Sequence, residues 1–134
     1  MEEEILLSGT VKRGRSVGKG MGFPTLNLRL NSGEPPEEGV YGAYVYVDGR
    51  EYEAVAHYGP KPTFDNDKAV FEAHLIGGSG DFYGKKAVVK ILGKIRGIKQ
   101  FGSVELLKAQ IQQDIACARR LYFTMGLYGS TGSP

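Results

Sequence analysis

A glycine-rich segment that ends in a hydroxyl and an amide is the part of this sequence best suited to nucleotide chemistry. Its glycines are Gly14, Gly18, Gly20 and Gly22. Because glycine has no Cβ, the backbone N–H groups of such a loop can turn inward and hold phosphate oxygens. The segment runs into Thr25 and Asn27, whose side chains are able to hold a metal-bound nucleotide. The residue types therefore indicate nucleotide binding.

The glycine spacing excludes the two familiar phosphate-binding loops. A P-loop needs a glycine, four further residues and then Gly-Lys-Ser/Thr, but Arg13 stands in the place of the first glycine and Gly20 follows Lys19. A dinucleotide fingerprint has the spacing G-x-G-x-x-G before a helix, whereas Gly18, Gly20 and Gly22 are one residue closer together. Lys19 could contact phosphate, although loop lysines are more often solvated. The segment is thus a phosphate loop of another kind.

Two predicted strands could each present a polar pair on one face. After Pro24 the residues alternate with period two, so Thr25 and Asn27 share a strand face. In the segment 69–76, Glu72 and His74 share the face opposite an apolar one. Taken singly, such residues more often face solvent or satisfy neighbouring backbone groups than carry chemistry.

Six segments have the composition of short strands. They are residues 5–11, 25–30, 40–47, 51–56, 69–76 and 86–92. Asp48-Gly49 lies between two of them and is a strong hairpin signal. Because no helix is predicted between the strands, the pattern favours an antiparallel barrel or sandwich.

The last predicted element is a helix. Its apolar residues recur at three- and four-residue steps: Val104, Leu107, Ile111, Ile115, Ala118 and Leu121. Ser103 is the expected N-cap, and Arg119-Arg120 near the end would suit the helix dipole. We expect the apolar stripe to pack as a lid on the strands.

Composition narrows the function classes further. The 134 residues carry a net charge of +2, which is too small to argue for binding to nucleic acid or an acidic membrane. No segment has the apolar length that a membrane span needs. The single Cys117 fits a reducing compartment, and the acidic start lacks the basic region of a signal peptide, so we expect a cytoplasmic protein.

Taken together, the motifs from residue 8 to about residue 120 resemble the riboflavin kinase family, either the stand-alone enzyme or the C-terminal module of bifunctional FAD synthetases. The matching blocks are Gly9-Thr10-Val11, the glycine loop with Gly22-Phe23-Pro24-Thr25-Leu26-Asn27, Gly39-Val40-Tyr41, Gly59-Pro60-Lys61-Pro62-Thr63-Phe64, Phe71-Glu72-Ala73-His74, Asp81-Phe82-Tyr83-Gly84-Lys85, Arg96 with Phe101, and Leu107, Gln110-Ile111 and Asp114. A Pro-Thr-x-Asn motif alone is weak, whereas so many blocks in one order are specific.

The resemblance implies a mainly β fold, a closed six-stranded antiparallel Greek-key β-barrel with a C-terminal α-helix. We expect one domain over residues 1–125 and a flexible tail over residues 126–134. The implied reaction is ATP-dependent phosphorylation of riboflavin at its 5′-hydroxyl, which gives FMN and ADP and uses Mg²⁺ or another divalent cation. We expect a cytoplasmic monomer that binds neither nucleic acid nor membranes.

The resemblance also implies site roles. Glu72 would be the general base, and Thr25 and Asn27 would hold the metal and the nucleotide phosphates. The residues that would wrap the phosphates are Gly14, Gly18, Lys19, Gly20 and Gly22. The flavin would lie between barrel and helix, near Phe82, Tyr83, Arg96 and Phe101.

Four positions depart from the family pattern. Leu26 replaces the usual Ala but points to the other strand face, and Lys19 replaces Arg without its bidentate fork. Ile98 stands where an acidic residue is common, and His57 stands where the family has the Asn of an Asn-x-Gly sequence. Since Thr25, Asn27 and Glu72 are all present, we interpret the chain as catalytically competent, with altered flavin-loop chemistry.

Three other hypotheses stay open at this point. The chain could be a non-catalytic flavin- or nucleotide-binding barrel of the same fold. It could be a small barrel that binds nucleic acid, although the sequence has no basic and aromatic stripe. It could also be an excised module of a bifunctional synthetase, in which case these residues are not expected to adenylylate FMN.

Overall fold

The computed structural model describes residues 5–12, 24–60, 69–77 and 80–129, with side chains described as far as Tyr122. The elements are β1 (Ile5–Lys12), β2 (Thr25–Ser32), β3 (Gly39–Val47), β4 (Arg50–Gly59), β5 (Val70–Ile76), β6 (Lys86–Arg96) and α1 (Val104–Gly129). The predicted nucleotide-binding residues Gly14, Gly18, Lys19, Gly20 and Gly22 lie outside the described residues.

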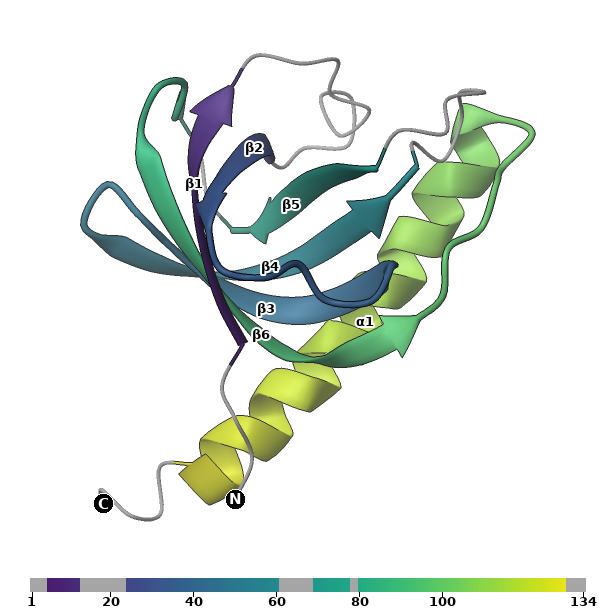
Figure 1. Cartoon of the computed structure of the whole chain (residues 1–134). Coiled ribbons are helices and arrows are strands. Elements are labelled where there is room, and N and C mark those ends of the chain that lie inside the picture. Colours follow the sequence, from purple (N-terminus) through teal and green to yellow (C-terminus); the bar gives the residue numbers. More distant parts are fainter. Residues whose placement is uncertain (1–4, 13–23, 61–68, 78–79, 130–134) are drawn as a thin grey trace.

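The strands form a closed antiparallel barrel (Figure 1), which confirms the predicted fold class. Their order around the barrel is β1-β2-β5-β4-β3-β6, and β6 pairs with β1 to close it. The three consecutive strands β3, β4 and β5 are followed in space by β2, which is a Greek-key arrangement. Closure removes the exposed sheet edges that a sandwich would keep.

The predicted hairpin turn at Asp48-Gly49 joins β3 and β4. Asp48 has φ +54° and Gly49 has φ +77°. Positive φ at both central residues is the requirement of a type I′ turn, whose twist matches that of the flanking strands. The turn therefore sets the register, in which Val47 pairs with Arg50.

The barrel interior is apolar because each strand turns its apolar positions inward. On β5 these are Phe71, Ala73 and Leu75, all buried, as the alternation predicts. Leu26 is also in this core, so its departure from the family pattern affects packing inside the barrel. Glu72 and His74 consequently point outward.

The helix packs against the outside of the barrel, along β3, β4 and β6 (Figure 1). Gly42 on β3 pairs with Gly93 on β6, and a Cβ added at Gly42 would lie 2.8 Å from the Leu121 side chain. The two glycines thus leave the space that Leu121 occupies. The predicted N-cap is confirmed, because the Ser103 hydroxyl accepts a hydrogen bond from the Leu106 N–H at 3.2 Å.

The helix is longer than the sequence predicts. It continues past Arg120 to Gly129, and its last turn contains no basic residue, so the expected dipole pairing of Arg119-Arg120 with the helix end is wrong. The physical reason is tertiary packing. Tyr122 is buried, its hydroxyl donates to the Ala54 carbonyl, and its ring stacks on Tyr44. The division into a domain at 1–125 and a tail stays a prediction.

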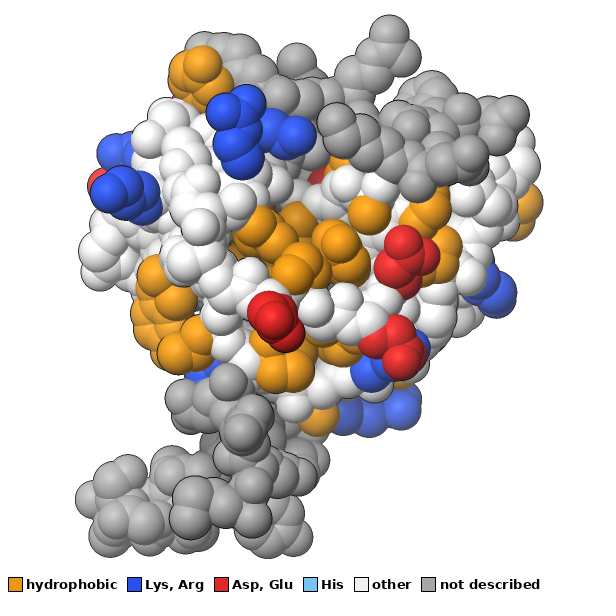
Figure 2. Space-filling model, viewed as in Figure 1, with side chains coloured by type: hydrophobic (Ala, Val, Ile, Leu, Met, Phe, Trp, Pro, Cys, Tyr) orange, Lys and Arg blue, Asp and Glu red, His pale blue; other side chains and the backbone are white. Residues whose placement is uncertain are grey.

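Figure 2 shows how side chains are distributed on one face of the molecule. Hydrophobic side chains gather near the centre, and Lys and Arg are scattered around them with Asp and Glu in between. The described side chains of this face form no continuous basic stripe. Among the described residues, no helix is long and apolar enough to cross a membrane.

Candidate functional site

A single row of paired residues crosses five strands on the outer face of the barrel. Asn27 on β2 pairs with Glu72 on β5, and Glu72 pairs with His57 on β4. The row continues from His57 to Val40 on β3 and from Val40 to Arg96 on β6. Directly paired residues project to the same face with Cβ atoms about 4.5–5.5 Å apart. The barrel topology therefore brings Asn27, Glu72 and His57 together.

The polar part of this row is buried although it lies outside the barrel. Asn27 is 7% exposed, Glu72 is 6% exposed and His57 is 7% exposed. Outward-facing polar residues of a barrel are normally solvated, so this shelter marks the row as a candidate site.

Thr25 lies beside the row on the same strand face as Asn27. It pairs with His74 on β5, and its Oγ1 lies 2.9 Å from the Nδ1 of His74. This contact gives His74 a structural partner on the neighbouring strand. Thr25 and Asn27 therefore place a hydroxyl group and an amide group on one strand face, beside Glu72.

A narrow pocket of about 30 Å³ separates the row from the helix. It is lined by Val40, Val55, His57, Glu72, His74, Arg96, Lys99, Leu107, Ile111 and Asp114. The barrel contributes both polar and apolar side chains to this lining, whereas α1 contributes the apolar Leu107 and Ile111 and the acidic Asp114. This mixture suits a ligand with one polar end and one apolar body.

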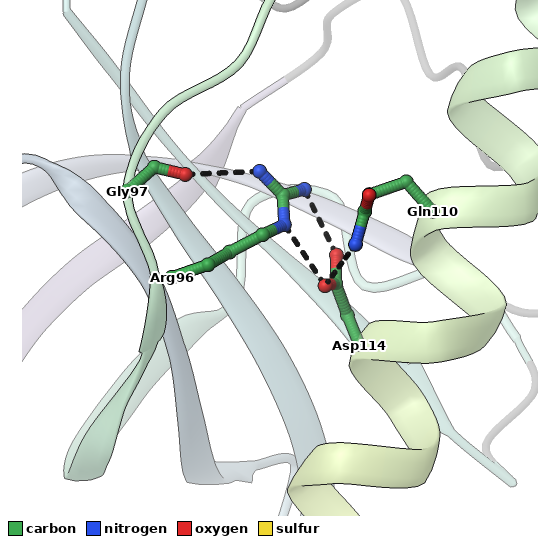
Figure 3. A network of polar contacts seen from close by, with 4 residues as sticks. All are labelled: Arg96, Gly97, Gln110 and Asp114. Atoms are coloured by element: carbon green, nitrogen blue, oxygen red, sulfur yellow. Dashed lines mark hydrogen bonds and ion pairs between the residues drawn. The ribbon is translucent and has the colours of Figure 1, made fainter.

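An ion pair holds the end of β6 to the helix (Figure 3). Arg96 Nε and Nη2 donate to the two carboxylate oxygens of Asp114, each at 2.9 Å. Gln110 also donates to Asp114 at 3.1 Å, and Arg96 Nη1 donates to the Gly97 carbonyl at 3.0 Å. Asp114 is 1% exposed. Because the fork is bidentate and sheltered, it fixes Arg96 at the pocket wall.

The residues predicted at the flavin edge fall into two groups. Arg96 lines the pocket, and its guanidinium lies 5.7 Å from the ring centroid of Phe101. Phe82, in contrast, is buried in the barrel core against Tyr52, and Tyr83 is 52% exposed. Neither Phe82 nor Tyr83 is among the described residues that line the pocket.

The turn that contains Phe82 and Tyr83 is tied to the end of β1. Gly84 N–H donates to the Val11 carbonyl at 2.8 Å, and Val11 N–H donates to the Lys85 carbonyl at 2.9 Å. The glycine-rich segment begins just after β1 in the sequence. This turn is therefore attached to the strand that leads into the glycine-rich segment.

Two buried histidines in the pocket are neutral near pH 7. Burial, with a smaller effect of the nearby Arg96 guanidinium, lowers the pKa of His57 from 6.5 to about 4. Burial likewise lowers the pKa of His74 to about 4, and proximity to His57 adds to the shift. Both imidazoles can therefore accept as well as donate a hydrogen bond.

These shifts predict a loss of stability in mild acid. At pH 5 the unfolded chain protonates both histidines, whereas the folded chain does not. The stability that depends on these neutral histidines is therefore present above pH 6.5, the pKa in the unfolded chain. It is lost as the pH falls toward about 4, the pKa in the folded chain. We expect the free energy of unfolding to decrease by about 2 kcal/mol for each histidine when the pH is lowered from 7 to 5. Urea unfolding in EDTA at both pH values measures this loss.

The matched variant is His57→Gln. It removes one of the two buried imidazoles, so its loss between pH 7 and pH 5 should be smaller than the wild-type loss by about 2 kcal/mol. If wild-type protein and the variant lose the same free energy of unfolding between pH 7 and pH 5, His57 does not cause the acid destabilisation.

Sequence reasoning compared His57 and Asp114 with the family pattern but gave neither residue a role in the site. His57 follows the predicted strand end at residue 56, but β4 continues to Gly59 and places His57 in the row. Asp114 stands within the apolar stripe, three residues after Ile111 and four before Ala118. An acid at such a position requires a buried partner, which is a signal that could have been used.

The predicted metal ligands in the described part of the chain are Thr25 and Asn27. No group of three or more His, Cys, Asp or Glu side chains that could hold a metal ion occurs in the described part of the chain. The hydroxyl of Thr25 and the amide oxygen of Asn27 remain, and two neutral oxygens suit a hard cation that also binds phosphates and water.

Comparisons with known proteins agree on one family. A family model for riboflavin kinase matches residues 1–122. The bifunctional riboflavin kinase/FMN adenylyltransferase of Pseudomonas fluorescens is 37% identical over 86% of this chain and 37% of its own length. The RNA-binding riboflavin kinase RibR of Bacillus subtilis is 34% identical over 91% of this chain and 53% of its own.

A solved structure has the same fold over most of the chain. A Streptococcus pneumoniae protein described as a macrolide-efflux protein matches with a TM-score of 0.75 and 34% identity, over 85% of this chain and 38% of its own length. This chain thus spans well under half of the bifunctional relative and of the solved protein.

Proposed function

The chain belongs to the riboflavin kinase family, and from that premise we propose that it transfers the γ-phosphoryl group of ATP to the 5′-hydroxyl of riboflavin. One observation carries the proposal: Asn27 and Glu72 are paired neighbours in a buried row that opens on a pocket. Asn27, proposed to hold the metal and the phosphates, is therefore next to Glu72, proposed as the base. Phosphoryl transfer to a hydroxyl requires the phosphate and the base to be this close together.

Glu72 acts as the general base. Its carboxylate accepts a hydrogen bond from the 5′-hydroxyl of riboflavin and takes the proton as that oxygen bonds to the γ-phosphorus. The bond between the γ-phosphorus and the bridging oxygen breaks at the same time, and ADP leaves with the bonding electrons. Because the transition state is loose, positioning of the hydroxyl and neutralisation of charge account for most of the rate.

Thr25 and Asn27 hold the divalent cation, for which we propose Mg²⁺. If the Thr25 hydroxyl donates its proton to Nδ1 of His74, its lone pairs are left for the cation, and the 2.9 Å contact fits this arrangement. The cation, when bound, neutralises charge on the phosphates. The roles of the glycine-rich segment and Lys19 in holding those phosphates stay predictions.

Flavin binding requires the pocket to widen. Its volume of about 30 Å³ suits a water molecule, whereas ligand sites occupy about 300–1,000 Å³. The wall most able to move is the segment between β6 and α1, residues 97–103, which has no regular structure before the helix. We therefore propose that the ring enters between this segment and the barrel.

The test is conversion of riboflavin to FMN by the purified chain with ATP and MgCl₂, followed by chromatography. We expect FMN and ADP in equal amounts and complete loss of product in excess EDTA, with recovery when Mg²⁺ is restored. No FMN under several nucleotides and divalent metals would reject the kinase and leave a flavin- or nucleotide-binding barrel.

Two activities named for relatives are not part of this proposal. RibR is named as RNA-binding, but this chain matches 53% of its length, and the face in Figure 2 carries no continuous basic stripe among its described side chains. FMN adenylylation is named for relatives that are much longer than this chain. A monomeric state and a cytoplasmic location stay predictions.

A further inference from the structure

His57 is a buried side chain whose two ring nitrogens have no hydrogen-bond partner among the described residues. It is 7% exposed and lines the pocket. Nearly all buried polar atoms in proteins have a partner, so an imidazole without one in a pocket wall indicates that a ligand supplies it. The roles proposed for Glu72, Thr25 and Asn27 leave His57 without a function.

The position of His57 in the row indicates which part of the ligand it meets. On one side it pairs with Glu72, and on the other it pairs with the apolar Val40. Leu107 and Ile111 of the helix line the same pocket, together with Asp114. The row therefore begins at the phosphate side with Asn27 and continues with the proposed base Glu72. The His57 imidazole comes next, and the apolar Val40 follows it.

Riboflavin has the same order of groups. Its terminal hydroxyl is the phosphoryl acceptor, further hydroxyls follow along the ribityl chain, and the apolar ring comes last. With Glu72 at the terminal hydroxyl, a side chain one strand away, at a Cβ separation of about 4.5–5.5 Å, reaches the hydroxyls between that end and the ring.

We propose that His57 hydrogen-bonds a hydroxyl in the middle of the ribityl chain and so makes the pocket select flavins that carry a polyol. This inference rests on the proposed function, because it assumes that the reacting hydroxyl lies at Glu72. A neutral imidazole offers one donor and one acceptor, and a hydroxyl can satisfy either.

The environment of His57 fits this role. Arg96, which lies two strands further along the row, and Asp114 influence the ionisation of His57, and Lys99 lines the same pocket. With its pKa lowered to about 4, the ring carries no charge near pH 7. It can therefore contact a hydroxyl without adding a further cation to a pocket that Arg96 and Lys99 already line.

The test compares two ligands by quenching of flavin fluorescence, without ATP. Riboflavin carries the ribityl chain, and lumiflavin has the same ring with a methyl group in its place. We expect His57→Leu to weaken riboflavin binding about tenfold, the value of one hydrogen bond, and to leave lumiflavin binding unchanged. In turnover assays the same variant should raise KM more than it lowers kcat.

Two further variants keep the test decisive if His57→Leu does not fold. In His57→Asn the new amide group lies near the position of Nδ1, and in His57→Gln it lies near the position of Nε2. At least one of the two variants should therefore keep the wild-type preference for riboflavin. Tyr58→Phe is the matched control, because Tyr58 is the next residue on β4 and packs against Phe71 of the barrel core.

The outcomes separate this inference from the proposed function. An unchanged ratio of riboflavin to lumiflavin affinity in all His57 variants overturns the inference, as does an equal loss for both ligands. If wild-type protein makes no FMN but shows the His57-dependent preference, the kinase proposal fails and the inference stands.

Discussion

Glu72→Gln is expected to lower kcat for FMN formation by about 10²–10⁴-fold, the usual contribution of a general base. The amide has nearly the same shape as the carboxylate and can still accept a hydrogen bond from the 5′-hydroxyl. It cannot take the proton, so the hydroxyl must attack without losing it to the protein. Riboflavin binding should therefore change little, and the loss should appear in kcat rather than in KM.

The matched control is Glu53→Gln, which removes the same charge from an exposed position on β4. Rates are measured by FMN chromatography and riboflavin affinity by fluorescence, both with wild-type protein alongside. Unchanged turnover in Glu72→Gln would remove Glu72 from the mechanism. A loss of riboflavin binding in step with turnover would instead assign Glu72 a binding role.

Local patterns in the sequence were enough to predict the elements. Alternation placed Glu72 outward and Phe71 inward, and Asp48-Gly49 predicted the hairpin, since both depend on residues that are neighbours along the chain. The same alternation placed Thr25 and Asn27 on one face, as the structure does.

The grouping of these residues was not available from local patterns. Asn27 pairs with Glu72 because β2 lies beside β5, although β3 and β4 intervene in the chain. Such non-local register depends on packing of the whole barrel, and only the family resemblance suggested it. The helix end was mispredicted for the same reason, because contacts of Leu121 and Tyr122 with the barrel extend it past Arg120.

His57 and Asp114 show where single-position reasoning fails in the site itself. His57 became part of the pocket only because β4 continues for three residues beyond its predicted end at residue 56. Asp114 is an acid within an apolar stripe, and its partner Arg96 lies on another element, 18 residues earlier in the chain. A sequence can indicate that such an acid needs a cation, but it does not say which one.

Asp114→Ala is expected to destabilise the fold by about 3–5 kcal/mol, the cost of removing one partner from a buried ion pair. Arg96 has a side-chain exposure of 17% and loses both of its carboxylate contacts, and Gln110 loses its acceptor. Urea unfolding at pH 7 measures the change. A loss of less than about 1 kcal/mol, the value of an exposed pair, would mean that Arg96 finds compensation in solvent.

A double replacement distinguishes an unpaired charge from lost packing. In Arg96→Met with Asp114→Leu both charges disappear and apolar volume is kept, so we expect the double variant to be more stable than Asp114→Ala. Because Arg96 lines the pocket and joins β6 to α1, the double variant should still lose riboflavin affinity. Recovery of stability without recovery of binding would show that this ion pair serves the site. Recovery of both would limit its role to holding the helix on the barrel.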